Sequence, residues 1–298
     1  MKTDGSQVIG DLVNGEVSFK EVNGESNALD WTKVLSLHSA ASSSEYESNI
    51  INEWLPKLDG DDIAQTETAS EHLANVGLPV IDPLLKSFVD TNAAEPNHRY
   101  RLFGRIIPGY ADGFNRTLDM VRMENGKTAR GDLSGSELTL ELDSGDKQTI
   151  AFDEIRWAAV RQSEIRRELE LQALDHCSYI GYMDTGIFVD SASKVEGVAS
   201  GFARLSFDED GWATGPEGIA EPLPGKRKLQ EGFRWGCLLG RTGTTGERWY
   251  AGDKFAKSDI GTGRFYLVIN DNEHWQNNIG SYRVVVEASN AFDIGDAR

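Results

Sequence analysis

The sequence has few cysteines and no long apolar run, and both absences limit what the chain can be. Cys177 and Cys237 are its two cysteines, and neither stands in a CxxC or CxxH pair. Two cysteines are too few for a disulfide framework or a structural zinc site, so we expect both to be small buried residues. No stretch approaches the roughly 20 apolar residues of a membrane helix. No apolar signal region follows the first basic residue either, so we expect no membrane span, and a protein that is cytoplasmic or exported without a standard signal peptide.

Basic residues are also scarce, with 30 Lys and Arg against 48 Asp and Glu and a formal net charge of −18. A surface of this sign repels phosphate backbones, so the sequence predicts no nucleic-acid partner. The same surface attracts divalent cations without specificity.

Catalytic motifs are missing as well. The sequence contains no HExxH, GxSxG or P-loop, and its five histidines are scattered. His176 stands next to Cys177 at the edge of an apolar run, with no oxyanion loop nearby in the sequence. No second carboxylate is placed to partner Asp271 in glycoside hydrolysis. We therefore predict a protein that is not an enzyme.

The spacing of apolar residues changes along the chain and predicts a multidomain α+β protein. Residues 1–26 hold two alternating runs joined through Asn-Gly and predict a short β arm. Residues 27–110 space apolar residues three and four apart, as in ALDWTKVLSLHSA, and predict a small helical region. Its stretch ASEHLANVGLPVIDPLLKSFVD resembles one HEAT-type repeat. Such repeats need about three units to stand alone, so we expect this region to lean on a neighbour or a protein partner.

The rest of the chain reads as β structure. Residues 111–165 contain five short alternating runs and predict a small five-stranded β-barrel similar to SH3 or Sm-like domains. Its strands are acidic and lack a basic aromatic platform, which favours a structural or protein-contact role over RNA binding. Residues 166–290 contain eight further runs and predict a β-sandwich, followed by a tail at 291–298.

The stretch NDNEHWQNNIGSYRVVV concentrates oxygen-bearing side chains between two predicted strands. Asp271 stands at a strand end, and Asn277 and Asn278 follow six and seven positions later. A loop of this length can fold back on itself, and calcium takes six to eight oxygens from carboxylates, amides, backbone carbonyls and water. The spacing is not that of an EF-hand. A solvated turn has the same composition, so the residues alone leave both interpretations open.

A family resemblance favours the cation. GRFYLVINDNEHWQNNIGSYRVVV, with FRWGCLLGRTG and ASGFARLSF before it, resembles the soluble galactophilic bacterial lectins and their wider domain family over roughly residues 170–290. The resemblance implies a lectin-like β-sandwich that binds a galactose-like sugar through a calcium ion. The metal ligands that it implies are the side chains of Asp271, Asn277 and Asn278, the backbone carbonyl of Leu205, and a carbonyl from His274 or Trp275.

Calcium accepts extra neutral oxygens, so two vicinal sugar hydroxyls can complete its shell while the ligating side chains hydrogen-bond the same hydroxyls. Trp275 would either stack on the apolar face of the sugar or plug the end of the sandwich. His274 and Trp212 are further candidate ligand contacts.

Two functions follow from these residues. The first is a modular binding protein whose C-terminal sandwich binds calcium and, through it, a glycan. The second is a structural or assembly protein that uses the sandwich and the helical region as protein-interaction modules.

Overall fold

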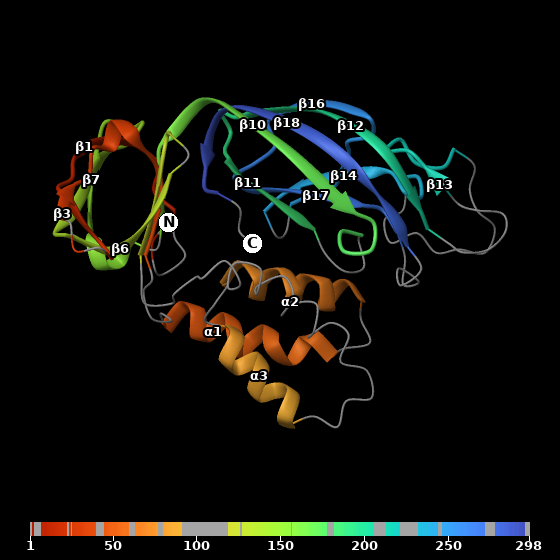
Figure 1. The fold of residues 1–298 in the computed structure, drawn as a ribbon, viewed down its shortest axis with the longest axis horizontal. Coiled ribbons are helices and arrows are strands. Elements are labelled where there is room, and N and C mark those ends of the chain that lie inside the picture. The colour runs from red at the N-terminus through yellow and green to blue at the C-terminus, as the bar shows by residue number, and fades with distance from the viewer. Residues whose placement is uncertain are drawn as a thin grey trace.

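The computed structural model confirms a β-rich multidomain α+β protein, with β structure at both ends of the chain and a small group of helices between them (Figure 1). None of the described helices is long and apolar enough to cross a membrane. The described residues are 2, 7–22, 24, 26–39, 45–59, 63–76, 80–90, 119–125, 127–155, 157–177, 182–205, 213–220, 232–243, 246–271 and 278–295.

The N-terminal β module joins two stretches of chain that the helices separate. A six-stranded sheet has the order β3-β2-β6-β5-β4-β9, and a three-stranded sheet has the order β1-β7-β8. Both sheets contribute to one apolar core, around which they curl in Figure 1. The strands are β1 (Asp11–Asn14), β2 (Val17–Glu21), β3 (Ser26–Ala28), β4 (Val34–His38), β5 (Asp119–Met123), β6 (Thr128–Gly135), β7 (Glu137–Glu141), β8 (Lys147–Ala151) and β9 (Trp157–Ala159).

This module differs from the one predicted. The five strands expected within 111–165 are there as β5–β9, but β1–β4 complete the same sheets, so residues 1–26 are not a separate arm. The expected helix over ALDWTKVLSLHSA is instead a short 3-10 turn, η1 (Trp31–Lys33), and strand β4. Strand β4 lies between β5 and β9, and Val34, Ser36 and Leu37 are all buried. A strand buried on both faces loses the alternation that distinguishes it from a helix.

The helices lie where the sequence predicts helices, between residues 45 and 90. They share an apolar core that includes Ile51, Leu58, Leu73 and Leu84. The pKa of His72 on α2 is lowered, chiefly by burial. Figure 1 shows α2 below the C-terminal sandwich. The elements are α1 (Glu45–Trp54), η2 (Leu55–Asp59), α2 (Ile63–Val76) and α3 (Ile81–Asp90).

The C-terminal module is built on one sheet that folds into two layers. Its main order is β13-β12-β18-β11-β17-β14-β15, with β10 also pairing with β18 and β16 with β12. The core between the layers includes Leu171, Ile187, Phe265 and Tyr282. Figure 1 shows β10, β18, β12 and β16 above β11, β17 and β14. The strands are β10 (Arg161–Gln172), β11 (Met183–Val189), β12 (Lys194–Arg204), β13 (Ala213–Thr214), β14 (Leu238–Thr242), β15 (Trp249–Tyr250), β16 (Lys254–Ser258), β17 (Gly263–Ile269) and β18 (Ile279–Asp293).

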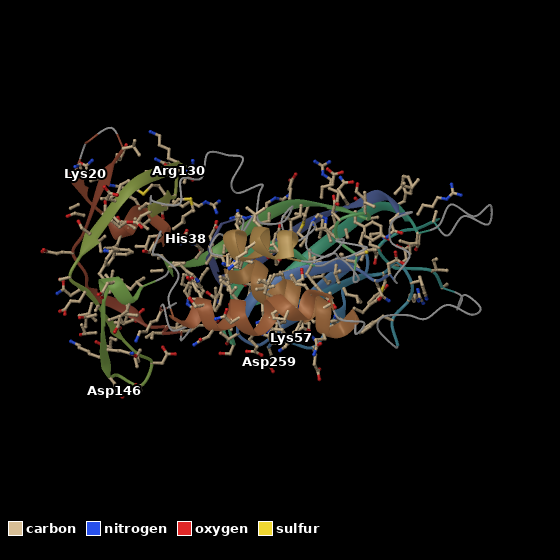
Figure 2. All side chains as sticks on the ribbon, turned by 90° about the horizontal axis from the view of Figure 1, so that it is seen from below. Lys20, His38, Lys57, Arg130, Asp146 and Asp259 are labelled. Atoms are coloured by element: carbon tan, nitrogen blue, oxygen red, sulfur yellow. The ribbon has the colours of Figure 1, made fainter. Side chains whose placement is uncertain are left out.

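The end of β18 joins the two β modules where the sequence predicts a tail. Asp293 is buried, and its carboxylate accepts hydrogen bonds from Arg122 of the N-terminal module at 2.6 Å and from Arg167 at 2.5 Å. Ile294 packs with Trp157 in an apolar cluster that both modules share. The His38 ring lies 3.0 Å from the Ile294 carbonyl oxygen, at the junction visible in Figure 2. Residues 291–295 are therefore part of the core.

Candidate functional site

Three strand ends meet at one edge of the sandwich and bring together part of the predicted site. Strands β12 and β18 pair as far as Arg204 and Ile279, so Leu205 and Asn278 each lie one residue beyond the last pair. Asp271 follows the end of β17 by two residues. The Asn278 amide nitrogen donates a 2.6 Å hydrogen bond to Asp271 Oδ2, which joins the ends of β17 and β18 directly.

The polar side chains at this edge are buried. Asn270, Asp271 and Asn278 are only 1%, 2% and 3% exposed. Asn278 Nδ2 also donates to the Ala173 carbonyl oxygen at 3.1 Å, so both of its amide hydrogens are used. Asn270 Nδ2 donates to the Arg234 carbonyl oxygen at 2.9 Å. The two amide groups are therefore held in fixed orientations.

The oxygens of these two amides, unlike their nitrogens, do not take part in the hydrogen bonds described above. Asn270 Oδ1 and Asn278 Oδ1 are buried, and neither has a hydrogen-bond partner among the residues that the structure describes. A buried acceptor without a partner costs about 1–3 kcal/mol. Native proteins contain few such atoms, and each calls for an explanation. Of the two residues, Asn278 is the one whose amide contacts the buried Asp271 carboxylate.

A buried tyrosine holds the backbone behind these amides. Tyr282 is fully buried, and its hydroxyl lies 2.7 Å from the Gly236 carbonyl oxygen and 2.9 Å from that of Gly215. The Gly236 amide donates to the Asn270 carbonyl oxygen at 2.7 Å, so the tyrosine is linked to the backbone at Asn270 through the single residue Gly236. Burial raises the pKa of Tyr282, which keeps the hydroxyl a donor at physiological pH.

Two glycines are required by the close approach of backbones at this edge. Gly236 has a φ of 71°, and a side chain there would meet Thr214 and Leu205. Gly280 has a φ of 89°, and a side chain would collide with the Phe202 carbonyl oxygen. Only glycine adopts such backbone angles at little cost. Both glycines lie in the stretches that carry the family resemblance.

The described residues thus unite Asp271, Asn278 and Leu205, the last of which is buried in the sandwich core. Asn270 and Tyr282 were passed over in the sequence, where Asn270 is the last residue before the predicted loop and Tyr282 is one of several alternating apolar positions. The predicted residues Asn277, His274, Trp275 and Trp212 lie outside the described residues.

The donor set suits a hard cation. Within the described part of the chain, no group of three or more His, Cys, Asp or Glu side chains is placed to hold a metal ion. Zinc and other soft or borderline metals prefer thiolate and imidazole ligands, which this group of side chains does not contain. One carboxylate with neutral amide and carbonyl oxygens is a ligand set that calcium accepts.

Comparison with known proteins gives likeness to solved structures alone. No protein-family model matches the chain, and no curated protein matches it. Among solved structures, a chain described as "EclA N-terminal domain; PllA-like lectin" is similar to 43% of this chain over 98% of its own length, at 22% identity and a TM-score of 0.34. The likenesses of the helices to a HEAT-type repeat and of the N-terminal module to SH3 or Sm-like barrels remain predictions.

Proposed function

We propose that this protein is a non-enzymatic binding protein whose C-terminal sandwich binds calcium and, through it, a carbohydrate. The observation that carries the proposal is the buried amide oxygen of Asn278, which lacks a hydrogen-bond partner among the described residues although its amide nitrogen contacts the Asp271 carboxylate. A cation at this edge would satisfy this oxygen and balance the charge of the carboxylate. Their burial also removes competing water, which strengthens attraction between a carboxylate and a cation.

The predicted ligands would contribute either negative charge or correctly directed neutral oxygens. Asp271 supplies the negative charge, and Asn278 supplies an amide oxygen whose direction is fixed by its two donated hydrogen bonds. The Leu205 carbonyl, together with Asn277 and the carbonyl of Trp275, would complete the protein ligands that the sequence predicts. Calcium, when bound, offers open coordination positions to vicinal sugar hydroxyls.

The test must separate this site from general attraction of cations to a protein of net charge −18. We would measure thermal unfolding of the full chain with calcium and after chelation, in the wild type, in Asp271→Asn and in Asp253→Asn. Asp253 is an exposed carboxylate on the same sandwich and serves as the matched control. Calcium at 100 times its dissociation constant should add about 2.7 kcal/mol to the stability of the wild type and the control.

Asp271→Asn should show no such gain, and a galactose-terminated glycan array should retain the wild type only when calcium is present. An equal rise in melting temperature for all three proteins would instead mean non-specific cation binding. If calcium stabilises the protein through Asp271 but the array retains no protein, the site is a structural cation site and the proposal of carbohydrate binding is refuted.

The outer face of β12 favours the second candidate, a protein-interaction module. Val198 and Phe202 are 56% and 59% exposed there, and Ile279 on the neighbouring strand is 43% exposed. The register places all three on the same face of the sheet. Exposed apolar groups of this kind mark contact surfaces. Replacing Val198 and Phe202 by serine should abolish binding of a co-purifying protein if this function holds, and retention of the partner would contradict it.

A further inference from the structure

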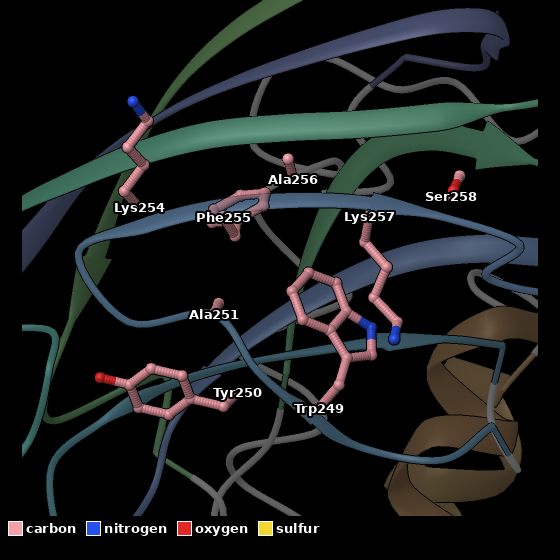
Figure 3. A pocket seen from close by; sticks show the side chains of 8 residues that line it. All are labelled: Trp249, Tyr250, Ala251, Lys254, Phe255, Ala256, Lys257 and Ser258. Carbon is pink, nitrogen blue, oxygen red and sulfur yellow. The ribbon is translucent and has the colours of Figure 1, made fainter.

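An open pocket of about 580 Å³ lies at the edge of the sandwich, where the chain crosses from β15 to β16 (Figure 3). It is separate from the candidate cation site, because β16 pairs with β12 no further than Val198, whereas that site begins at Leu205. Seven residues of extended chain span about 20 Å. The pocket is lined by Trp249, Tyr250, Ala251, Lys254, Phe255, Ala256, Lys257 and Ser258.

The indole of Trp249 is a fixed donor in this pocket. Its ring stacks parallel to Phe265, with centroids 6.0 Å apart, and meets Phe255 edge-on at 5.6 Å. The indole nitrogen is buried and has no hydrogen-bond partner in the described ranges. Contacts on two sides prevent the ring from turning to find one, and an unsatisfied buried N–H favours any acceptor that can enter.

Lys257 adds a positive charge beside this donor. The alternation of β16 puts it on the same side of the strand as the buried Phe255, and its ammonium lies 5.6 Å from the centroid of the Trp249 ring. Figure 3 shows the ammonium near the indole nitrogen, while Lys254 points away from the ring. Lys257 makes no ion pair with any described residue, in contrast to Lys194, which pairs with Glu196. Two donors without an acceptor therefore converge.

Tyr250 provides a rigid, exposed ring at the other side of the pocket. Its side chain is 44% exposed, although its hydroxyl is fixed by a 3.1 Å hydrogen bond to the Glu217 carbonyl oxygen. Gly252, at a φ of 65°, lies so close that a side chain there would sit 2.7 Å from the ring. A ring held in place and open to solvent on one face is suited to the apolar C–H face of a sugar.

We propose that this pocket binds an acidic sugar, with the carboxylate of a hexuronate between Lys257 and the Trp249 N–H and the pyranose ring over Tyr250. A neutral sugar leaves the ammonium without its counter-charge, and a bare anion leaves the aromatic face uncovered. The exposed carboxylates of Asp253 and Asp259 flank β16 and oppose an anion, so we expect a dissociation constant of about 1 mM.

The test uses the full chain, ¹⁵N-labelled, stripped of calcium and desalted, so that the candidate cation site takes no part. The Trp249 indole N–H resonance, assigned by its loss in Trp249→Phe, is followed while galacturonate, galactose or sodium sulfate is added. We expect a saturable shift with galacturonate and none of comparable size with galactose or sulfate. Equal shifts with galactose would refute the requirement for a negative charge on the ligand. Equal shifts with sulfate would refute the requirement for a sugar ring.

Three variants isolate the lysine. Lys257→Gln should weaken galacturonate binding about tenfold, since a charge-assisted hydrogen bond is lost. Lys257→Arg, which keeps the charge, should retain binding. Lys147→Gln, an exposed lysine of the N-terminal module, should behave as the wild type. Unchanged binding in Lys257→Gln would overturn the proposal, whatever calcium does elsewhere, because calcium is not in the assay.

Discussion

Removing the Tyr282 hydroxyl tests whether this buried side chain supports the edge of the sandwich. In Tyr282→Phe, the Gly236 carbonyl oxygen loses the donor that stands 2.7 Å away. The Gly215 carbonyl also accepts from the Gly218 amide at 3.0 Å, so it keeps a partner. One buried carbonyl is thus left without its hydrogen bond, at a cost of about 1–3 kcal/mol. Phenylalanine fills the same volume, so no cavity term adds to this.

The measurement is urea-induced unfolding in calcium-free buffer, with Tyr250→Phe as the matched control. The Tyr250 hydroxyl also donates to a carbonyl, but at 3.1 Å and from an exposed side chain, so its loss should cost less than about 0.5 kcal/mol. Tyr282→Phe should also bind calcium more weakly, because Gly236 holds the backbone of Asn270, the residue before Asp271. Equal stabilities for the two variants would refute the reasoning, since they would show that burial adds nothing to this hydrogen bond.

Three further changes address the junction, the pH response and the backbone. Asp293→Ala strands two arginines at the interface of the β modules and should cost about 3 kcal/mol in chemical unfolding, against under about 1 kcal/mol for the exposed ion-pair variant Glu287→Ala. Burial raises the pKa of Asp190, whereas hydrogen bonds, the strongest of them from Arg161, lower it. The hydrogen bonds outweigh burial, so the net pKa lies below the usual 3.8. Its stabilisation is therefore present above about pH 4 and lost as pH falls through the folded pKa, so Asp190→Asn should destabilise less in unfolding at pH 3 than at pH 7. Gly236→Ala forces a left-handed alanine whose side chain would also meet Thr214, so it should lower stability by more than the about 1–2 kcal/mol of the left-handed backbone alone, measured in the same way.

The sandwich was predictable because its strands alternate. In β12, Val195, Ala199 and Ala203 are buried, whereas Lys194, Glu196 and Val198 are exposed, and this period of two is visible in the letters. Strand β4 could not be predicted in the same way. It pairs on both edges and is buried on both faces, so its apolar residues do not alternate with polar ones. The sequence-derived boundary at 165/166 also failed, because charged residues from Arg161 onward belong to β10, which pairs with β18 along its whole length.

The end of β18 was misread for a different reason. The strand turns at Asn290, which has a φ of 52°, and then pairs with β11 in the other layer. Ser193 and Arg161 each donate a 2.7 Å hydrogen bond to the Asn290 carbonyl oxygen and hold this corner. Asparagine tolerates left-handed geometry and is therefore a turn signal in sequence. A strand that bends without ending produces the same signal, so the sequence indicated a tail where the chain crosses between layers.

The candidate site was predictable in its members but not in its environment. A solvated turn and a cation-binding loop both explain why Asp271 and Asn278 lie near strand ends. Only the solvated turn requires the two side chains to face water. Both are nearly fully buried, because Asn278 inserts between the Asp271 carboxylate and the Ala173 carbonyl. A buried carboxylate costs several kcal/mol unless a positive group or several donors compensate it. The Asn278 amide supplies one such donor. The burial of Asp271 and Asn278 is therefore the feature that the sequence could not show, and it argues against a solvated turn.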